Sequence, residues 1–320
     1  MKALVRHRYG SANLDLEEIA EPTPGDDQVL VRVAAASVNP LDWYALTGTP
    51  WLMRLSDGVR RPKQPVLGRD VAGTVVAVGA KVTSLALGDE VFGCGNGTFA
   101  EFVLGNERSL VRRPAEVGVS AAAATPLAAL TALQALRDKG ALQAGQSVLV
   151  NGAAGGVGTF AVQLAVTMGA CVAAVCSTAN IDMVRSLGAH EVVDYTKQEV
   201  GARQFDLIID NIGNHSLASR RKMMAPNGRC VIVGAPMKGK LLGPMTPMVR
   251  AVIGSWFRSQ KFLPFMAATN AADLTILAAH LKGGTLVPEV GQTYALADAP
   301  DAFRRIAAGH TRGKLLIAPA

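Results

Sequence analysis

Two patterns of hydrophobic and polar residues divide the chain. Up to about residue 120, short apolar runs such as 29–33, 73–78, 91–93 and 99–103 are separated by Gly and Pro. This arrangement is typical of short strands in an irregular β unit. From about residue 122, apolar runs of strand length alternate with stretches that carry apolar residues at helical spacing. The alternation predicts a doubly wound parallel sheet.

The second pattern predicts five strands and the helices that connect them. We expect strands at 147–150, 171–176, 191–193, 205–209 and 229–233, with helices over 157–168 and 181–187. Further on, the pattern predicts a strand near 287–296, a helix over 298–308 and a last strand at 314–317. The sequence therefore predicts an α/β protein, and its 320 residues are enough for two domains.

Composition and charge are those of a soluble globular protein. Hydrophobic residues make up 49% and charged residues 18%, which argues against disorder. The most apolar stretch, 121–136, is too short to cross a bilayer, and the N-terminus lacks the pattern of a signal or transit peptide. We therefore expect a cytoplasmic protein without membrane insertion. The net charge of +7 comes from scattered basic pairs and aromatic residues are only 5%, so no nucleic-acid partner is expected.

The strongest single motif is a glycine-rich turn after the strand at 147–150. Residues 152–158 read Gly-Ala-Ala-Gly-Gly-Val-Gly and lead into a predicted helix. Glycines in this context let the backbone turn tightly and approach a pyrophosphate, which the free N–H groups of the helix N-terminus then bind. We predict that a dinucleotide binds here, at Gly152, Ala154, Gly155, Gly156, Val157 and Gly158.

The end of the next strand predicts which dinucleotide binds. An NAD site usually places Asp or Glu about 20 residues after the turn. This chain has Ser177, Thr178 and Asn180 instead, with no acid before Asp182. Hydroxyl and amide groups suit a 2′-phosphate that a carboxylate would repel, so NADPH is predicted over NADH. Further cofactor contacts are expected where the fourth and fifth strands end, at Asn211, Gly213, Gly234 and Ala235.

Motifs in both parts of the chain resemble those of the medium-chain dehydrogenase/reductase superfamily. Residues 37–42, 67–73 and 88–91 match its N-terminal domain, and the glycine turn is similar to that of the quinone reductase branch. Asn39-Pro40-x-Asp42, Gly68-Arg69-Asp70 and Gly-Thr-Phe at 158–160 resemble the part of this branch that contains the mitochondrial reticulon-interacting oxidoreductase. The resemblance implies a GroES-like, mostly β catalytic domain from 1–122 and 264–320. It also implies a Rossmann domain from 123–263.

The chain departs from the zinc-dependent members of the superfamily. Those members have a cysteine ligand at the position of Asn39 and Gly-His-Glu at the position of Gly68-Arg69-Asp70. Here an amide and a guanidinium replace a thiolate and an imidazole, and a guanidinium does not lose its proton to bind metal. The four closely spaced cysteines of the structural zinc lobe are also absent, since Cys94 is alone in that region. We therefore predict no metal site and no zinc.

Without a Lewis acid, an enzyme cannot strongly polarise an unactivated ketone. Hydride from NADPH is therefore expected to go to an electrophilic acceptor, either a quinone or an α,β-unsaturated carbonyl. The resemblance implies that Asn39, Asp42 and Tyr44 line the catalytic cleft, with Tyr44 as donor to the developing oxygen and Asn39 as a positioning amide. From the residues alone, Tyr44 is as well explained by packing, and Asp42 as the N-terminal cap of a helix.

The resemblance also implies three further cofactor contacts, from Thr131, Tyr195 and Lys314. On pattern alone, Thr131 is an ordinary helix residue and Lys314 a surface lysine before the last strand. The partners expected are a small electrophilic acceptor and a second copy of the chain, as a homodimer.

Two other functions stay open on the sequence. An enoyl-thioester reductase on the same scaffold would be favoured by a deep basic channel near Arg250, Arg258 and Lys261. A dinucleotide-binding protein of low turnover, like a lens crystallin or an RNA-binding module, is the other. RNA binding with steep salt dependence requires clustered cations, and the sequence shows none.

Overall fold

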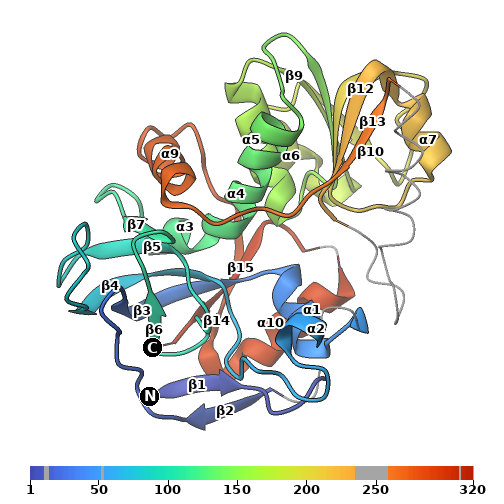
Figure 1. The fold of residues 1–320 in the computed structure, drawn as a ribbon. Helices are drawn as coiled ribbons and strands as arrows, with labels where there is room; N and C mark the ends of the chain where they lie inside the picture. Colours follow the sequence, from blue (N-terminus) through green and yellow to red (C-terminus); the bar gives the residue numbers. More distant parts are fainter. Residues whose placement is uncertain (11–13, 52–53, 235–258, 310, 320) are drawn as a thin grey trace. The chain divides into compact units, whose positions relative to one another are not determined.

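The computed structural model describes residues 1–10, 14–51, 54–234, 259–309 and 311–319. The chain divides into two compact units (Figure 1). The first comprises Met1–Leu130 with Thr269–Ala320, and the second comprises Thr131–Ala268. Within these described ranges, no helix is long and apolar enough to cross a membrane.

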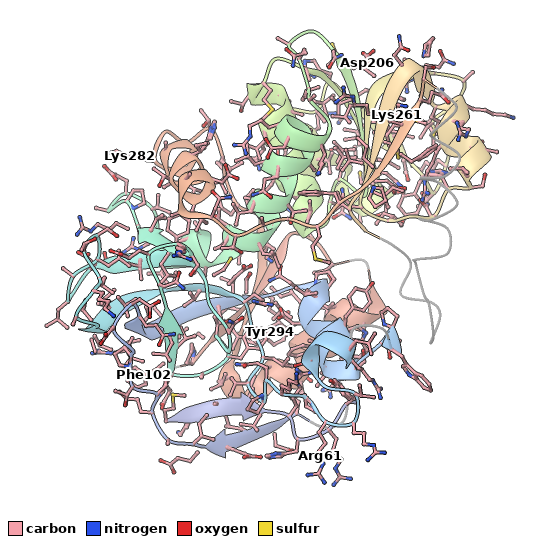
Figure 2. The ribbon with its side chains drawn as sticks, in the orientation of Figure 1. Arg61, Phe102, Asp206, Lys261, Lys282 and Tyr294 are labelled. Atoms are coloured by element: carbon pink, nitrogen blue, oxygen red, sulfur yellow. The ribbon has the colours of Figure 1, made fainter. Side chains whose placement is uncertain are left out.

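A mixed sheet is the framework of the first unit. Its strands are β3 (Val29–Val38), β4 (Asp70–Val78), β5 (Glu90–Cys94), β6 (Phe102–Gly105), β7 (Leu110–Arg112), β14 (Val290–Ala295) and β15 (Lys314–Ala318). Their order is β14-β15-β3-β4-β5-β7, with β6 also paired to β3. β15 pairs antiparallel with β3 and parallel with β14, so a C-terminal segment completes a sheet that begins near the N-terminus. Figure 2 labels Phe102 of β6 and Tyr294 of β14.

Smaller elements complete the first unit. β1 (Lys2–Val5) and β2 (Asp15–Glu18) form a separate antiparallel pair. The helices are α1 (Pro40–Thr47), α2 (Arg54–Asp57), α3 (Val119–Ala124), α9 (Ala271–Lys282) and α10 (Ala299–Ala308), and α4 (Pro126–Gln134) runs from this unit into the next.

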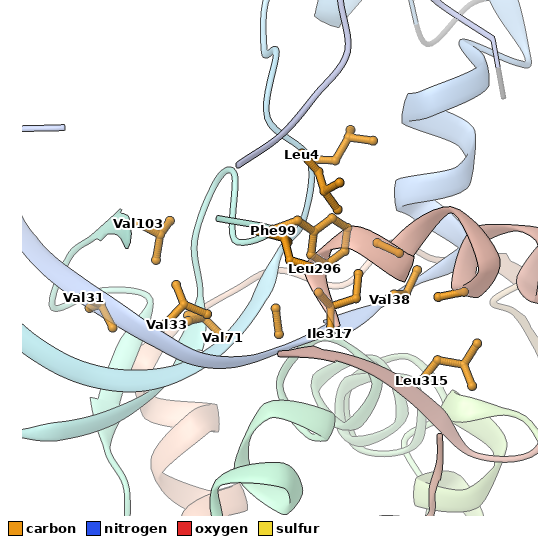
Figure 3. Packing of buried hydrophobic residues seen from close by; sticks show 14 of the residues in the cluster. Leu4, Val31, Val33, Val38, Val71, Phe99, Val103, Leu296, Leu315 and Ile317 are labelled. Carbon is orange, nitrogen blue, oxygen red and sulfur yellow. The ribbon is translucent and has the colours of Figure 1, made fainter. Parts of the chain in front are cut away.

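The core of the first unit joins residues from both ends of the chain. On α10, the buried residues Ala299, Ala302, Phe303 and Ile306 recur at intervals of three and four, so they lie on one face of the helix. Phe303 packs edge-on against Phe99, with ring centroids 5.8 Å apart. Figure 3 shows the surrounding cluster, in which Leu4, Val31, Val33, Val38, Val71, Phe99, Val103, Leu296, Leu315 and Ile317 are labelled. Each such buried side chain contributes about 1.5–3 kcal/mol.

A parallel sheet of six strands forms the second unit. Its strands are β8 (Ser147–Asn151), β9 (Cys171–Cys176), β10 (Glu191–Asp194), β11 (Phe205–Asp210), β12 (Met224–Ile232) and β13 (Lys261–Pro264). Their order is β10-β9-β8-β11-β12-β13. The helices are α5 (Gly156–Thr167), α6 (Ile181–Ser186) and α7 (Leu217–Lys222). Because the strand order reverses between β8 and β11, the carboxyl ends of these strands form the crevice where open α/β sheets bind ligands.

The predicted α/β class and all five predicted parallel strands are confirmed. The sixth strand, β13, was not predicted because it has only four residues and ends in Pro264. Proline cannot donate to a neighbouring strand, and β13 tolerates it as an edge strand. The sequence prediction also missed α9. In the first unit, the strand expected at 99–103 lies at Phe102–Gly105.

Candidate active site

The glycine turn lies between β8 and α5, as the sequence predicts. Gly152 has φ 79°, a left-handed conformation that favours glycine. A Cβ on Gly158 would come within 2.1 Å of the Gly152 carbonyl oxygen, so a side chain there has no room. Gly155 is the N-cap of α5 and its backbone is extended. Ala154, Gly156 and Val157 lie between these glycines, so the turn presents backbone N–H groups of the first helical turn to an anion.

The carboxyl ends of β8, β11 and β12 bring three more predicted residues together. The Asn211 side chain donates to the Asn151 carbonyl oxygen at 3.0 Å. The Gly213 N–H donates to Asp210 Oδ1 at 2.9 Å, and the Gly234 N–H donates to the Asp210 carbonyl oxygen at 3.1 Å. These residues border the crevice expected for the cofactor. Ala235 lies outside the described residues, as do Arg250 and Arg258, which were to test the enoyl-thioester alternative.

Beside the end of β9 lies a carboxylate that the sequence argument missed. Asp194 ends β10 and lies in register with Cys176 of β9. The Thr178 hydroxyl donates to Asp194 Oδ2 at 2.5 Å and holds the pKa of this carboxyl below its ordinary value. Asp194 Oδ1 accepts from the N–H and hydroxyl of Thr196. The sequence carries no local signal for this contact, because it depends on the parallel pairing of β9 with β10, which aligns their carboxyl ends.

The remaining predicted residues of this region lie around the same strand ends. Asn180 donates one side-chain N–H to the Ser177 hydroxyl oxygen at 3.0 Å, so the hydroxyl hydrogen of Ser177 points elsewhere. The Tyr195 backbone N–H donates to the Cys176 carbonyl oxygen, and half of its side chain is exposed. Ser177 and Asn180 therefore keep hydrogens that their bond to each other does not use, whereas the Thr178 hydrogen goes to Asp194.

A hollow of about 540 Å³ lies at the amino end of the parallel strands of the second unit, opposite the carboxyl ends described above. Asp206, labelled in Figure 2, and Arg229 are among the residues that line it. No residue predicted for the site lines this hollow, and we assign it no part in the chemistry.

In the first unit, a buried polar cluster surrounds Asp70, which has no exposed surface. Asp70 Oδ2 accepts from the Ser37 hydroxyl at 2.5 Å and from the Asn39 side-chain amide at 3.0 Å. Asp70 Oδ1 accepts from the Leu127 N–H at 2.9 Å, at the start of α4. The carboxylate thus connects β3, β4 and α4 inside the unit.

Lys314 belongs to the same cluster. Its ammonium donates to Asn39 Oδ1 at 2.5 Å and lies 3.4 Å from Asp70 Oδ2. Only 3% of its side chain is exposed, so Lys314 is not the surface lysine that its pattern suggests. The Asn39 amide also donates to the Ser37 carbonyl oxygen, at 3.3 Å. Both amide hydrogens of Asn39 therefore have partners inside the protein, which suits a positioning residue.

Asp42 and Tyr44 lie on α1. The helix begins at Pro40 with Asn39 as its N-cap, and not after Asp42 as expected. The Asp42 carboxylate accepts from the Asn39 N–H at 2.8 Å, which satisfies a donor at the helix start. Burial, with a smaller contribution from Asp70, raises the pKa of Asp42 to about 7. Burial also raises the pKa of Tyr44, so its phenol keeps its proton at any ordinary pH.

A cavity of about 320 Å³ in the first unit brings these two side chains to one surface. Asp42 and Tyr44 line it together with Leu41, Arg69 and Asn96. Arg6 and Asp57 also line it and form an ion pair. The cavity therefore combines the Tyr44 phenol and the buried Asp42 carboxyl with the guanidinium groups of Arg6 and Arg69. The sequence analysis noted Arg69 and Asp70 as part of a family motif and as replacements for metal ligands, and did not predict them as site residues.

Thr131 lies on α4, partly buried, near the point where the chain passes from one unit to the other. The described part of the chain contains no group of three or more His, Cys, Asp or Glu side chains that could hold a metal ion. At Asn39, the position where the resemblance implies a ligand in zinc-dependent proteins, the side-chain oxygen accepts from the Lys314 ammonium.

Comparison with known proteins agrees with the fold. A family model described as "Alcohol dehydrogenase GroES-like domain" matches residues 25–115, and one described as "Zinc-binding dehydrogenase" matches residues 187–317. The solved quinone oxidoreductase of Coxiella burnetii superposes with a TM-score of 0.88 at 26% identity, covering 100% of this chain and 99% of that one. The fold is thus that of the medium-chain dehydrogenase/reductase superfamily, and the predicted fold class, a GroES-like domain with a Rossmann-type parallel sheet, is confirmed.

Two relatives identify the branch within this superfamily. The chloroplast envelope quinone oxidoreductase homolog of Arabidopsis thaliana is 32% identical, covering 100% of this chain and 98% of the relative. The mouse mitochondrial NAD(P)H oxidoreductase RTN4IP1 is also 32% identical, covering 99% and 89%. The chain belongs to the quinone oxidoreductase branch of the medium-chain dehydrogenase/reductase superfamily, as its motifs indicate. Because these relatives are named for different compartments, the cytoplasmic location stays a prediction.

Proposed function

We propose that the protein is a zinc-independent reductase that transfers hydride from NADPH to a quinone or an α,β-unsaturated carbonyl. The observation that carries this proposal is the Lys314 ammonium on the Asn39 oxygen. The Lys314 ammonium fills the position beside Asn39, and the neighbouring Asp70 carboxylate is already bonded on both oxygens. Because no metal ligand set remains there, the acceptor has to be electrophilic before it binds.

The second unit offers what a dinucleotide requires. The turn at Gly152 and the first turn of α5 provide backbone donors for a pyrophosphate. Ser177 and Asn180 support NADPH because each keeps a hydrogen for a 2′-phosphate. Asp194 counts against it, but Thr178 and Thr196 engage both of its oxygens. The preference that we propose is therefore moderate. When bound, NADPH supplies the hydride.

The residues of the first unit act on the acceptor. Hydride addition leaves negative charge on the acceptor oxygen, and the Tyr44 phenol lies at the cavity surface to donate to it. Asp42 is the proton source that we propose, because its pKa of about 7 lies close to neutral pH. One hydride and one proton convert an enone to the saturated carbonyl or a quinone to the quinol. Asn39 holds the start of α1, and hence both groups, in place.

The test is turnover of NADPH and NADH with a panel of quinones, enones and enoyl thioesters, using purified untagged protein. Quinones or enones should be reduced, NADPH should be preferred, and activity should survive a strong chelator. Elemental analysis should find far less than one zinc per chain. A stoichiometric metal that is lost together with activity would contradict the proposal. Preference for enoyl thioesters would favour the alternative reductase.

A further inference from the structure

The charges that line the cavity of the first unit do not balance. Arg6 is 1% exposed, and its guanidinium is engaged by Asp57 at 2.5 Å and by the Gln64 carbonyl oxygen at 3.1 Å. This pair is therefore neutral as a whole. Burial raises the pKa of the Asp42 carboxyl to about 7, so at neutral pH this group offsets less of the positive charge than an ordinary carboxylate would. Arg69 is the remaining charged residue of the lining.

Arg69 has no carboxylate partner among the described residues. Its exposed guanidinium donates to the Asn96 side-chain oxygen and forms no ion pair with a described acid, although its charge lowers the pKa of Asp42 by less than burial raises it. The adjacent Asp70 is bonded to Lys314 and Ser37 instead. Arg69 thus presents a positive charge at the cavity. A guanidinium has five N–H donors, and the bond to Asn96 engages one of them.

The backbone holds Arg69 and Asn96 in fixed positions. The Gly95 N–H donates to the Arg69 carbonyl oxygen at 2.7 Å, and the Gly97 N–H donates to the Gly68 carbonyl oxygen at 3.0 Å. These two bonds join the turn that carries Arg69 to the turn that carries Asn96. Within this frame the Asn96 side-chain oxygen accepts from the Arg69 guanidinium, so the guanidinium loses less freedom when it binds an anion.

We propose that the preferred acceptor is a small quinone or enone that carries a carboxylate, and that Arg69 binds this carboxylate. A guanidinium matches a carboxylate through paired hydrogen bonds. The cavity volume of about 320 Å³ is at the lower end for ligand sites, which suits one or two rings or a short chain. This inference rests on the proposed function and narrows its substrate class.

The experiment compares acceptors that differ only in charge, such as β-acetylacrylate and its methyl ester, with NADPH as donor. The ester is intrinsically the better electrophile, so a lower KM for the acid indicates recognition of the carboxylate. The wild type should prefer the acid. Arg69→Gln should raise the KM of the acid by about 10- to 100-fold, as expected for one or two hydrogen bonds between charged groups. The KM of the ester should stay within about twofold, since it lacks the charge that Arg69 binds.

Two further variants control this comparison. Arg69→Lys keeps the charge without the paired geometry and should restore part of the preference. Arg305→Gln removes an exposed arginine of α10 that does not line the cavity, and it should leave both KM values unchanged. Equal effects of Arg69→Gln on acid and ester, or a wild type without preference for the acid, would overturn the proposal.

An anion could also come from the dinucleotide. If Arg69 bound a cofactor phosphate, Arg69→Gln would raise the Kd of NADPH, measured by cofactor fluorescence, and would impair every acceptor alike. That result would overturn the assignment to the acceptor. If the wild type reduced no quinone or enone at all, the proposed function itself would fail, and this outcome is distinct from a missing charge preference.

Discussion

The two units gather their polar groups in different ways. In the second unit, the predicted cofactor residues follow strands at the carboxyl edge of one parallel sheet, where strand direction alone brings them together. In the first unit, the cluster around Asp70 draws groups from β3, α4 and β15 into the interior. The polar groups of the second unit are therefore positioned by the backbone, and those of the first unit by buried charge. We expect the buried cluster of the first unit to be far more sensitive to a single substitution.

The largest effect should come from Lys314→Met, which leaves the Asp70 carboxylate buried without its ammonium. Breaking a buried ion pair costs about 3–5 kcal/mol. The matched control is Lys282→Met, because Lys282 lies 3.5 Å from Glu116 and both side chains are more than half exposed. Such a pair contributes about 1 kcal/mol or less. Urea unfolding followed by circular dichroism measures both losses, and equal losses would remove the contrast between buried and exposed charge.

Asp42 and Asp206 should give the two units opposite responses to pH. In the unfolded chain the pKa of Asp42 is near 3.8, and in the folded protein it is about 7. The folded form holds this proton more tightly, so its stabilisation is complete below the unfolded value and is lost as pH rises to about 7. The slope is at most about 1.4 kcal/mol per pH unit. Asp42→Asn should remove it.

Asp206 is the counterpart in the second unit. Hydrogen bonds from the Ser147 N–H and hydroxyl lower its pKa, so its contribution is present at neutral pH and is lost as pH falls through that lowered value. Asp206→Asn should therefore weaken the protein at neutral pH but not in acid. Unfolding free energies of the wild type and both variants, measured from acid to neutral pH, test the two predictions. If both substitutions changed the pH dependence of stability in the same direction, the predicted contrast would be wrong.

Tyr44→Phe tests whether the cavity of the first unit performs chemistry. Loss of a donor to a developing oxyanion lowers kcat and kcat/KM together, by about 10²–10³-fold. The effect should be smaller, about tenfold, with a reactive quinone, since its reduction needs less stabilisation. Steady-state kinetics with one quinone and one enone measure both. Unchanged kinetics with the two acceptors would assign Tyr44 to packing.

Gly158→Ala tests the dependence of the second site on backbone shape. The new Cβ would meet the Gly152 carbonyl oxygen at 2.1 Å, so the turn has to move. Overpacking of this kind costs about 1–3 kcal/mol. Gly155→Ala is the control, because there the nearest atom is 3.6 Å from the Cβ and φ is −80°. Thermal unfolding should separate the two variants, and similar melting temperatures would show that the turn is not tightly packed.

The smallest effect concerns the choice of dinucleotide. Ser177→Asp should repel a 2′-phosphate and bind the ribose hydroxyl, removing a preference for NADPH of about tenfold, or about 1.4 kcal/mol. In the control Ser177→Asn, the new side chain has nearly the shape of aspartate but no charge, so this variant should keep most of the preference for NADPH. The Kd values of NADPH and NADH follow from cofactor fluorescence at fixed ionic strength. Tighter binding of NADH by the wild type would refute the prediction.

Local patterns explain why much of the second unit could be predicted. The turn at 152–158 and its flanking strand and helix lie within one short segment, and the structure has them where the pattern predicts. Asp194 could not be placed, because its position beside Thr178 depends on the order of the strands. Lys314 and Asp70 are 244 residues apart, and no local pattern predicts that a lysine before the last strand turns inward.

The position of β15 between β3 and β14 has a consequence for synthesis on the ribosome. Residues 131–268 emerge as one continuous segment and can form their sheet as soon as they leave the exit tunnel. Residues 1–130 emerge earlier, yet they lack the strand that pairs with β3 and the ammonium that neutralises Asp70 until residue 314 has been added. The middle of the chain can therefore finish folding before its beginning, and the N-terminal segment is the part that has to wait.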